Sequence, residues 1–214
     1  MKKEIRKEEI INAARKIIIE RGYKKTSVQE ITNEVGIAKG SFYTYFKSKS
    51  ELVIDLVLDK ISEIKEKNEK ILEEEMSLAN AFERYAYNVA KLPLEDPKFF
   101  IIMMRLFDYR EDLEKNVREE LCSLHLKRGA FVRRILNKYK EEIDIVKEGE
   151  IERYVGMIAG LVDTYYENVV APVVSDSLSI NSIDIKETEK LVNKIDINYE
   201  VEFMKKCILK LILK

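Results

Sequence analysis

Residues 27–46 of the chain read SVQEITNEVGIAKGSFYTYF, and this stretch decides the fold of the amino-terminal end. Ser27 and Glu30 form the pattern S-x-x-E, a capping box in which each residue satisfies a free backbone N–H group of the other at the start of a helix. Gly36 predicts the end of that helix, because glycine readily adopts the positive φ of a helix carboxyl terminus. A short helical segment follows at 38–46. The order of helix, tight glycine-containing turn and short helix predicts a helix-turn-helix.

A longer helix is expected before this unit, over about residues 3–21. Its apolar residues recur at helical spacing and share one face: Ile10, Ala14, Ile17 and Ile18. Gly22 follows directly as a stop signal. Three helices in about 46 residues are therefore expected at this end of the chain.

The third segment has two unlike faces. Ala38, Phe42 and Phe46 are four residues apart, so we expect them to pack on the two preceding helices. The remaining positions carry cationic, hydroxyl and tyrosine side chains: Lys39, Ser41, Tyr43, Thr44 and Tyr45. Such side chains can donate hydrogen bonds to phosphates and contact base edges, and Gly40 leaves the backbone open to close approach. Thr26 and Ser27 stand at the start of the second helix, whose free N–H groups can bind a phosphate.

The rest of the chain has long helical periods. They are expected at 50–74, 77–92, 96–108, 111–142, 148–171 and 199–213, with a loop at 173–198 that holds a short helix near 186–195. Pro93, Pro97 and Pro172 fall at the ends of these segments, where proline is tolerated. With only 7 glycines and 3 prolines in 214 residues, turns must be few, which disfavours strand-rich folds. The sequence predicts an all-α fold, divided into a DNA-binding domain at 1–49 and a larger helical domain at 50–214.

Charge and composition narrow the function. Residues 1–50 carry 12 Lys and Arg against 6 Asp and Glu, whereas the whole chain has a net charge of -1, so a polyanion-binding end is indicated. The 2 cysteines are expected to be free thiols. No apolar run is long enough to span a bilayer, and we expect a cytoplasmic protein without membrane contact. The motifs H-E-x-x-H, G-x-x-x-x-G-K and C-x-x-C are absent, so no enzyme activity, cofactor or metal is expected.

The ordered pattern from Ile10 to Leu52, with K-G-S-x-Y-x-Y-F-x-S-K at 39–49, closely resembles the N-terminal domain of TetR-family transcriptional regulators. The resemblance implies a homodimeric repressor that binds a palindromic operator in double-stranded DNA and is released by a small apolar effector. Ala38 departs from the family, because many members carry a capping serine there. The resemblance implies phosphate contacts from Thr26, Ser27, Tyr45 and Lys49. It places the following residues against the major groove: Lys39, Gly40, Ser41, Tyr43 and Thr44.

The larger domain offers candidate effector contacts, namely Tyr85, Met103, Phe107, His125 and Tyr165. An ordinary packed core explains these residues equally well. Two segments are expected to form a dimer interface. Segment 154–169 has apolar residues at helical spacing, and its Gly156 and Gly160 would let another helix approach closely. Segment 201–213 is apolar on most sides. The apolar residues of the first segment are Tyr154, Ile158, Leu161, Tyr165 and Val169.

Two other classes of protein stay open at this point. One is an all-helical module that binds a small molecule or a protein without binding DNA. The other is an all-helical enzyme, which the missing motifs disfavour; a di-iron bundle would need Glu-x-x-His pairs, and Cys122 stands three residues before the lone His125. Salt-sensitive retention on DNA separates the regulator from both.

Overall fold

The computed structural model describes residues 2–108, 114–143, 148–175, 178–179, 182–183 and 185–213. These residues are almost entirely helical, as predicted. The exception is a hairpin of two-residue strands, β1 (Leu178–Ser179) and β2 (Ser182–Ile183), which pair antiparallel with Leu178 opposite Ile183. The sequence predicts a loop over this segment, because strands this short leave no periodic pattern.

Three helices form the amino-terminal unit: α1 (Lys2–Arg21), α2 (Val28–Val35) and α3 (Lys39–Phe42). The capping box is confirmed, since the Glu30 amide donates to Ser27 Oγ at 3.2 Å and the Ser27 amide donates to Glu30 Oε2 at 2.9 Å. Gly36 ends α2 with a φ of 73°, as the sequence predicts. The two local signals therefore set both ends of α2.

The third helix is shorter than predicted. Of the three residues expected in the core, two are buried and one is exposed. Phe42 and Phe46 are buried, with ring centroids 5.6 Å apart. Ala38 is exposed, because it adopts an extended backbone as the N-cap residue and so lies outside the helical register. It makes no side-chain capping bond, as expected of alanine.

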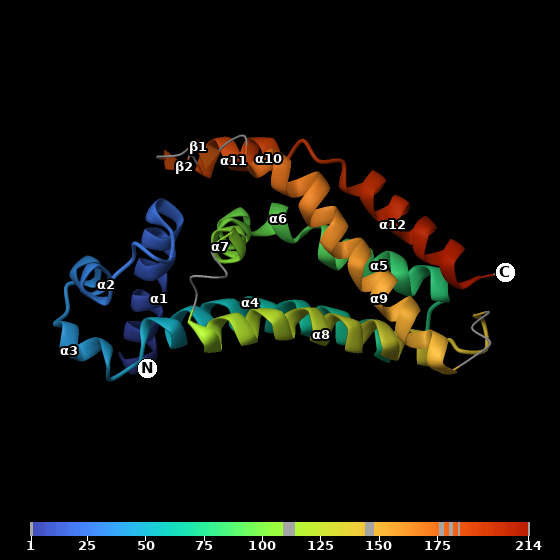
Figure 1. The fold of residues 1–214 in the computed structure, drawn as a ribbon, viewed down its shortest axis with the longest axis horizontal. Coiled ribbons are helices and arrows are strands. Elements are labelled where there is room, and N and C mark those ends of the chain that lie inside the picture. Colours follow the sequence, from blue (N-terminus) through green and yellow to red (C-terminus); the bar gives the residue numbers. More distant parts are fainter. Residues whose placement is uncertain are drawn as a thin grey trace.

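The larger part of the chain is a layered set of helices (Figure 1). Their bounds are α4 (Lys49–Glu73), α5 (Leu78–Ala90), α6 (Leu92–Glu95), α7 (Pro97–Asp108), α8 (Lys115–Lys138), α9 (Glu148–Tyr165), the π-helical turn η2 (Tyr166–Val170), α10 (Ala171–Ser175), α11 (Ile185–Val192) and α12 (Ile197–Ile212). Helices α4 and α8 run side by side along one edge, and α9 crosses from α8 towards α10. Helix α12 packs on α5 at the opposite edge.

The predicted helix end before Pro172 is wrong. Helix α9 passes through η2 directly into α10, and Pro172 is the second residue of that last segment. The π-helical turn before Pro172 shifts the backbone pairing, since the Ala171 amide donates to the Tyr166 carbonyl five residues back, and the proline follows directly on this shift.

Two apolar clusters hold these layers together. One joins the buried faces of α1, α2 and α3 to α4 and α7, so the amino-terminal unit shares its core with the larger part of the chain. The second joins α5, α8, α9 and α12. Among the described residues, no helix combines the length and the apolar character that crossing a membrane requires.

Candidate nucleic-acid interface

Helix α3 lies at one end of the molecule, and the residues expected to meet the major groove are exposed there (Figure 1). These are Lys39, Gly40, Ser41, Tyr43 and Thr44. The Tyr43 side chain is 53% exposed, and its ring stands edge-on to the buried Phe42 ring at 5.4 Å. The buried Phe42 therefore anchors the segment while its polar neighbours face outward.

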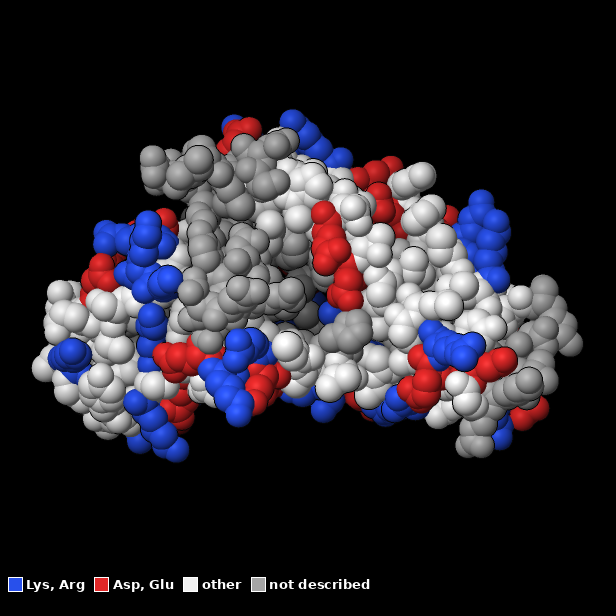
Figure 2. Space-filling model, viewed as in Figure 1, with Lys and Arg blue, Asp and Glu red and all other residues white. Residues whose placement is uncertain are grey.

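Gly40 lies in this exposed surface with an ordinary backbone conformation. A Cβ atom added at Gly40 would meet no atom within 4 Å, so no packing within the chain calls for glycine at this position. Figure 2 shows that this end of the molecule carries mainly uncharged side chains, with Lys and Arg around them. A surface of hydroxyls and aromatic rings bordered by cations is suited to a polyanion that is also read by its base edges.

The hydroxyl of Thr26, for which a phosphate contact is expected, is turned into the protein in this structure. Thr26 is 2% exposed, and its Oγ1 donates a 2.8 Å hydrogen bond to the carbonyl of Gly22. The bond closes the turn that joins α1 to α2. Its role here is therefore to hold the turn.

Ser27 is exposed, but the amino-terminal end of α2 already holds a carboxylate. The Ser27 hydroxyl donates to Glu30 Oε2 at 2.8 Å, and Arg21 donates to Glu30 Oε1 at 3.0 Å. The hydrogen bonds from Ser27, followed by the charge of Arg21, lower the pKa of Glu30. A phosphate at this helix end would meet the Glu30 charge, so the predicted Ser27 contact requires Glu30 to turn away.

The Lys49 side chain also forms its contacts within the chain. Its ammonium donates to the carbonyls of Tyr23 at 2.9 Å and Thr26 at 2.8 Å, and it lies 4.1 Å from the centroid of the Tyr23 ring. Burial lowers the pKa of Lys49. Of the other predicted phosphate contacts, Tyr45 is half-buried and packs against the apolar core.

Other polar residues of the helix-turn-helix unit, outside the predicted set, are exposed. Lys47 follows α3, and Gln29 and Asn33 lie one turn apart on α2, joined by a 2.8 Å hydrogen bond between their side-chain amides. A helical projection of α2 would have found this amide pair, because residues four apart share a face.

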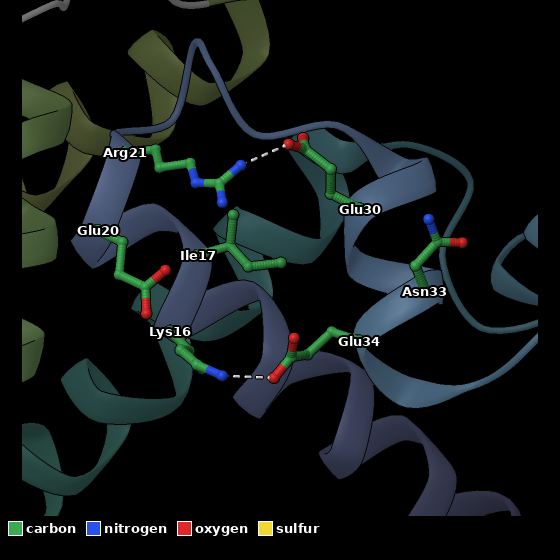
Figure 3. Close-up of a pocket in the computed structure, with 7 residues that line it drawn as sticks. All are labelled: Lys16, Ile17, Glu20, Arg21, Glu30, Asn33 and Glu34. Carbon is green, nitrogen blue, oxygen red and sulfur yellow. Dashed lines mark hydrogen bonds and ion pairs between the residues drawn. The ribbon is translucent and has the colours of Figure 1, made fainter.

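A surface hollow lies between α1 and α2 (Figure 3). Two ion pairs cross it, from Lys16 to Glu34 at 2.6 Å and from Arg21 to Glu30 at 3.0 Å. The two ion pairs that cross the hollow hold α1 and α2 together. No group of metal-ligating side chains occurs among the described residues.

The candidate effector residues are placed in both apolar clusters. Tyr85 is buried in the second cluster, while Tyr165 is buried in the first and Met103 is half-buried against it. The Tyr165 hydroxyl donates to the Ala90 carbonyl at 2.8 Å. The side chains of Phe107 and His125 lie outside the described part of the structure.

Tyr85 differs from the other buried tyrosines. Its hydroxyl is fully buried and finds no hydrogen-bond partner among the described residues. Burial raises the pKa of Tyr85, and the nearby charges of Arg128 and Asp163 modify that shift. Arg128 and Asp163 form a 2.7 Å ion pair between α8 and α9. The interior thus holds one unpaired hydroxyl next to a charged pair.

The two segments expected at a dimer interface leave apolar side chains exposed. On α12, Tyr199 and Phe203 stack with ring centroids 6.4 Å apart, and both are exposed. On α9, Met157 is exposed, and added Cβ atoms at Gly156 and Gly160 would meet nothing within 4 Å. Other residues of the two segments, such as Ile158 and Val201, are buried within the chain itself.

Comparison with known proteins identifies this arrangement. Residues 10–56 match the family described as bacterial regulatory proteins, tetR family. The chain is 32% identical over 139 residues to an uncharacterized HTH-type transcriptional regulator in the lacX 3' region of Lactococcus lactis, covering 55% of this chain and 69% of that protein. It is 35% identical over 83 residues to the fatty acid metabolism regulator protein of Bacillus subtilis, which is 39% of this chain and 41% of that protein. The chain thus spans less than half the length of this second relative.

Solved structures show the same fold over nearly the whole chain. The fatty acid degradation regulator FadR from Bacillus halodurans superposes with a TM-score of 0.67 at 20% identity, covering 95% of this chain and 94% of that one. FadR from Bacillus subtilis, in complex with stearoyl-CoA, superposes with a TM-score of 0.67 at 22% identity, covering 92% and 96%. At these identities the likeness is one of fold.

Proposed function

Because the chain belongs to the TetR family of bacterial regulatory proteins, we propose that it is a dimeric repressor that binds an operator sequence and is released by a small apolar effector. The observation that supports this best is the exposed face of α3, where Ser41, Tyr43 and Thr44 stand outward from the buried Phe42 and Phe46. These polar side chains can reach base edges and phosphates without any rearrangement of the helix-turn-helix.

Two copies of α3 would enter successive major grooves about 34–36 Å apart on a palindromic site. We place the boundary of the DNA-binding domain at residues 1–49 and that of the regulatory domain at 50–214, since α4 starts at Lys49 and runs the length of the larger part. Helix α4 then connects the two functions, because it begins directly after the DNA-binding unit.

The dimer is proposed to form through α9 and α12. The stacked Tyr199 and Phe203 and the exposed Met157 would be covered by a second copy. Gly156 and Gly160 allow a partner helix to approach closely, because no side chain separates the backbones. This pairing would form a four-helix interface of two helices from each copy.

We further propose that the effector is a long-chain acyl-CoA, a larger and amphipathic molecule whose acyl chain is its apolar part. A regulator of fatty acid metabolism is among the relatives, and FadR from Bacillus subtilis holds stearoyl-CoA in its crystal structure. In this chain Tyr85 lies in an apolar cluster with the charges of Arg128 and Asp163 nearby, and its unpaired hydroxyl can donate a hydrogen bond to a carbonyl group of a bound chain. Release requires the effector and the operator to favour different conformations of the protein.

The DNA-binding proposal is tested by fluorescence anisotropy of the full-length protein on the promoter fragment of its own gene. Wild-type protein should bind with an affinity that falls steeply with salt, and Tyr43→Ala should weaken binding by about tenfold through lost base or phosphate contacts. Tyr87→Ala is the matched control, because Tyr87 is an exposed tyrosine on α5. Binding that is absent in the wild type, or equal in Tyr43→Ala, would contradict the proposal.

The effector proposal is tested by calorimetric titration of stearoyl-CoA into the protein with and without the promoter fragment. Coupling between two sites is reciprocal, so DNA should weaken stearoyl-CoA binding by the same factor by which stearoyl-CoA weakens DNA binding. Equal stearoyl-CoA affinity in both titrations would exclude acyl-CoA as the releasing effector. Tyr85→Phe should weaken stearoyl-CoA binding, since only the hydroxyl is removed.

A further inference from the structure

Glu114 stands where the larger part of the chain meets the helix-turn-helix unit. It occupies the N-cap position of α8, but its side chain does not cap that helix. Its carboxylate instead accepts a 3.4 Å hydrogen bond from the Tyr23 hydroxyl and another from the Ser50 hydroxyl. These partners lie 91 and 64 residues away in the sequence. One carboxylate therefore joins three separate segments of the chain.

Both partners of Glu114 are withdrawn from water. Tyr23, in the turn between α1 and α2, is 5% exposed, and Ser50, in the first turn of α4, is 0% exposed. Glu114 itself is exposed, so its carboxylate reaches inward from the surface to these hydroxyls. Without Glu114 the Tyr23 and Ser50 hydroxyls would keep only their mutual contact at 3.5 Å. Neither buried hydroxyl can replace the carboxylate with water, which makes the loss of Glu114 costly for this arrangement.

Lys49 links the same group of residues to the start of α2. Its ammonium holds the carbonyls of Tyr23 and Thr26, and Thr26 immediately precedes Ser27, the N-cap of α2. The Glu114 cluster, defined here as Tyr23, Lys49, Ser50 and Glu114, thus sets where α2 begins relative to α4 and α8. Since α2 packs directly on α3, the orientation of α3 depends on it.

We propose that Glu114 is a positioning residue for DNA binding, which holds the helix-turn-helix unit at one orientation relative to α4 and α8. It also gives movements at the start of α8 a direct route to the DNA-binding unit. The inference rests on the proposed function, because it presumes that α3 reads DNA. Another tie, the 2.7 Å ion pair of Lys7 and Asp55, joins α1 to α4 but does not involve α8.

The chain provides a matched control in Glu69. Arg134 on α8 donates to Glu69 on α4 at 2.6 Å, so this pair also ties α4 to α8 through a carboxylate. It lies near the end of α4 that is far from the DNA-binding unit. Glu69→Gln therefore removes the charge of an α4–α8 tie without touching the Glu114 cluster.

The test measures promoter-fragment affinity of the full-length protein by anisotropy over a range of salt concentrations. Glu114→Ala should weaken binding by about fivefold or more, because an unconstrained unit must be ordered on binding. The slope of log affinity against log salt should stay unchanged, since the same phosphates are contacted in the complex. Glu114→Gln should restore most of the affinity because its amide oxygen still accepts hydrogen bonds, and Glu69→Gln should stay within about twofold of wild type.

A double-mutant cycle tests if Glu114 acts through its hydrogen bond with Tyr23. Tyr23→Phe keeps the ring over Lys49 and removes only the hydroxyl, so it is the variant that decides if Glu114→Ala fails to fold. If the two groups act through one hydrogen bond, Tyr23→Phe should lower the affinity, and adding it to Glu114→Ala should cause little further loss.

The outcomes separate the two proposals. No salt-sensitive DNA binding by wild-type protein would remove the proposed function, and this inference with it. Wild-type binding together with unchanged or tighter binding by Glu114→Ala, a reduced salt slope, or an equal loss in Glu69→Gln would overturn the role of Glu114 alone.

Discussion

The ammonium of Lys49 lies 4.1 Å from the centroid of the Tyr23 ring and donates a 2.9 Å hydrogen bond to the Tyr23 carbonyl. These two residues are 26 positions apart, and the contact fastens the start of α4 to the turn after α1. Burial lowers the pKa of Lys49, while the Glu114 and Glu30 carboxylates oppose that shift. Lys49, for which a contact with a DNA phosphate is expected, therefore stabilises the DNA-binding unit in this structure.

Lys49→Met is accordingly expected to destabilise the fold. It removes two charge-assisted hydrogen bonds to carbonyls, so the free energy of unfolding should fall by about 1.5–3 kcal/mol, as measured by urea denaturation. Lys47→Ala is the control, because Lys47 is exposed. It should change the free energy of unfolding by less than about 0.5 kcal/mol and reduce the salt slope of DNA binding by about one. If Lys49→Met left the free energy of unfolding unchanged and reduced the salt slope of DNA binding, Lys49 would be a phosphate contact.

Gly40→Ala should separate folding from DNA binding. Its φ is not positive and an added Cβ meets no atom within 4 Å, so the free energy of unfolding should stay equal or rise by up to about 1 kcal/mol. DNA affinity should fall, because the methyl group projects from the surface that faces the groove. Gly36→Ala should instead destabilise the fold, since Gly36 has a φ of 73°. Thermal melts and promoter anisotropy on both variants check this, and full DNA affinity in Gly40→Ala would contradict it.

Phe203→Asp should convert the proposed dimer to a monomer. The Phe203 side chain is 50% exposed, so a charge there is tolerated in a single chain but would be buried without a partner in the dimer. Sedimentation velocity of the purified protein measures the change. Leu126→Asp serves as the control, because Leu126 is a more exposed apolar residue on α8, outside the proposed interface. If Leu126→Asp dissociates the dimer and Phe203→Asp does not, the interface lies elsewhere.

Tyr85→Phe and Tyr165→Phe should differ in their effects on stability. The Tyr165 hydroxyl donates to the Ala90 carbonyl, so its removal should lower the free energy of unfolding by about 1 kcal/mol. The Tyr85 hydroxyl has no partner among the described residues, so Tyr85→Phe should be neutral or stabilising. Urea denaturation of the two variants measures both changes. Equal destabilisation would mean that the Tyr85 hydroxyl is satisfied by bound water.

Alkaline pH should destabilise the protein through its buried tyrosines. Burial raises the pKa of Tyr23, Tyr85, Tyr165 and Tyr166 above the ordinary value of 10.0. In the unfolded chain these groups lose their protons near pH 10, whereas the folded chain retains them, so their contribution is complete below pH 10 and declines above it. The free energy of unfolding should therefore fall as the pH rises above 10, and the ultraviolet absorbance should show these tyrosines ionising only as the protein unfolds. Their ionisation near pH 10 in folded protein would contradict the burial.

The features predicted correctly are those set by near neighbours in the chain. The capping box of Ser27 and Glu30 and the helix stop at Gly36 depend on residues within one or two turns. The burial of Phe42 and Phe46 follows from helical spacing, and the same spacing turns Ser41 and Tyr43 outward. The all-helical character and the helix-turn-helix order were therefore readable from sequence alone.

The details that were missed depend on backbone conformation or on distant segments. Ala38 left the helical register because it became an N-cap, and the helical path continued through Pro172 because a π-helical turn preceded it. Neither outcome is encoded in a periodic pattern, since both depend on how neighbouring helices meet.

Local hydrogen bonding and helical periodicity, both legible in the sequence, set the helices of the DNA-binding unit and the outward direction of Ser41 and Tyr43, but not the exposure of Ala38 or the burial of Thr26. Tertiary structure alone decided what Lys49, Tyr23 and Glu114 do. A hydrogen bond forms only when donor and acceptor come within about 3.5 Å. For these groups the partners lie 23 to 91 residues away, a proximity that only the packing of α1, α4 and α8 creates.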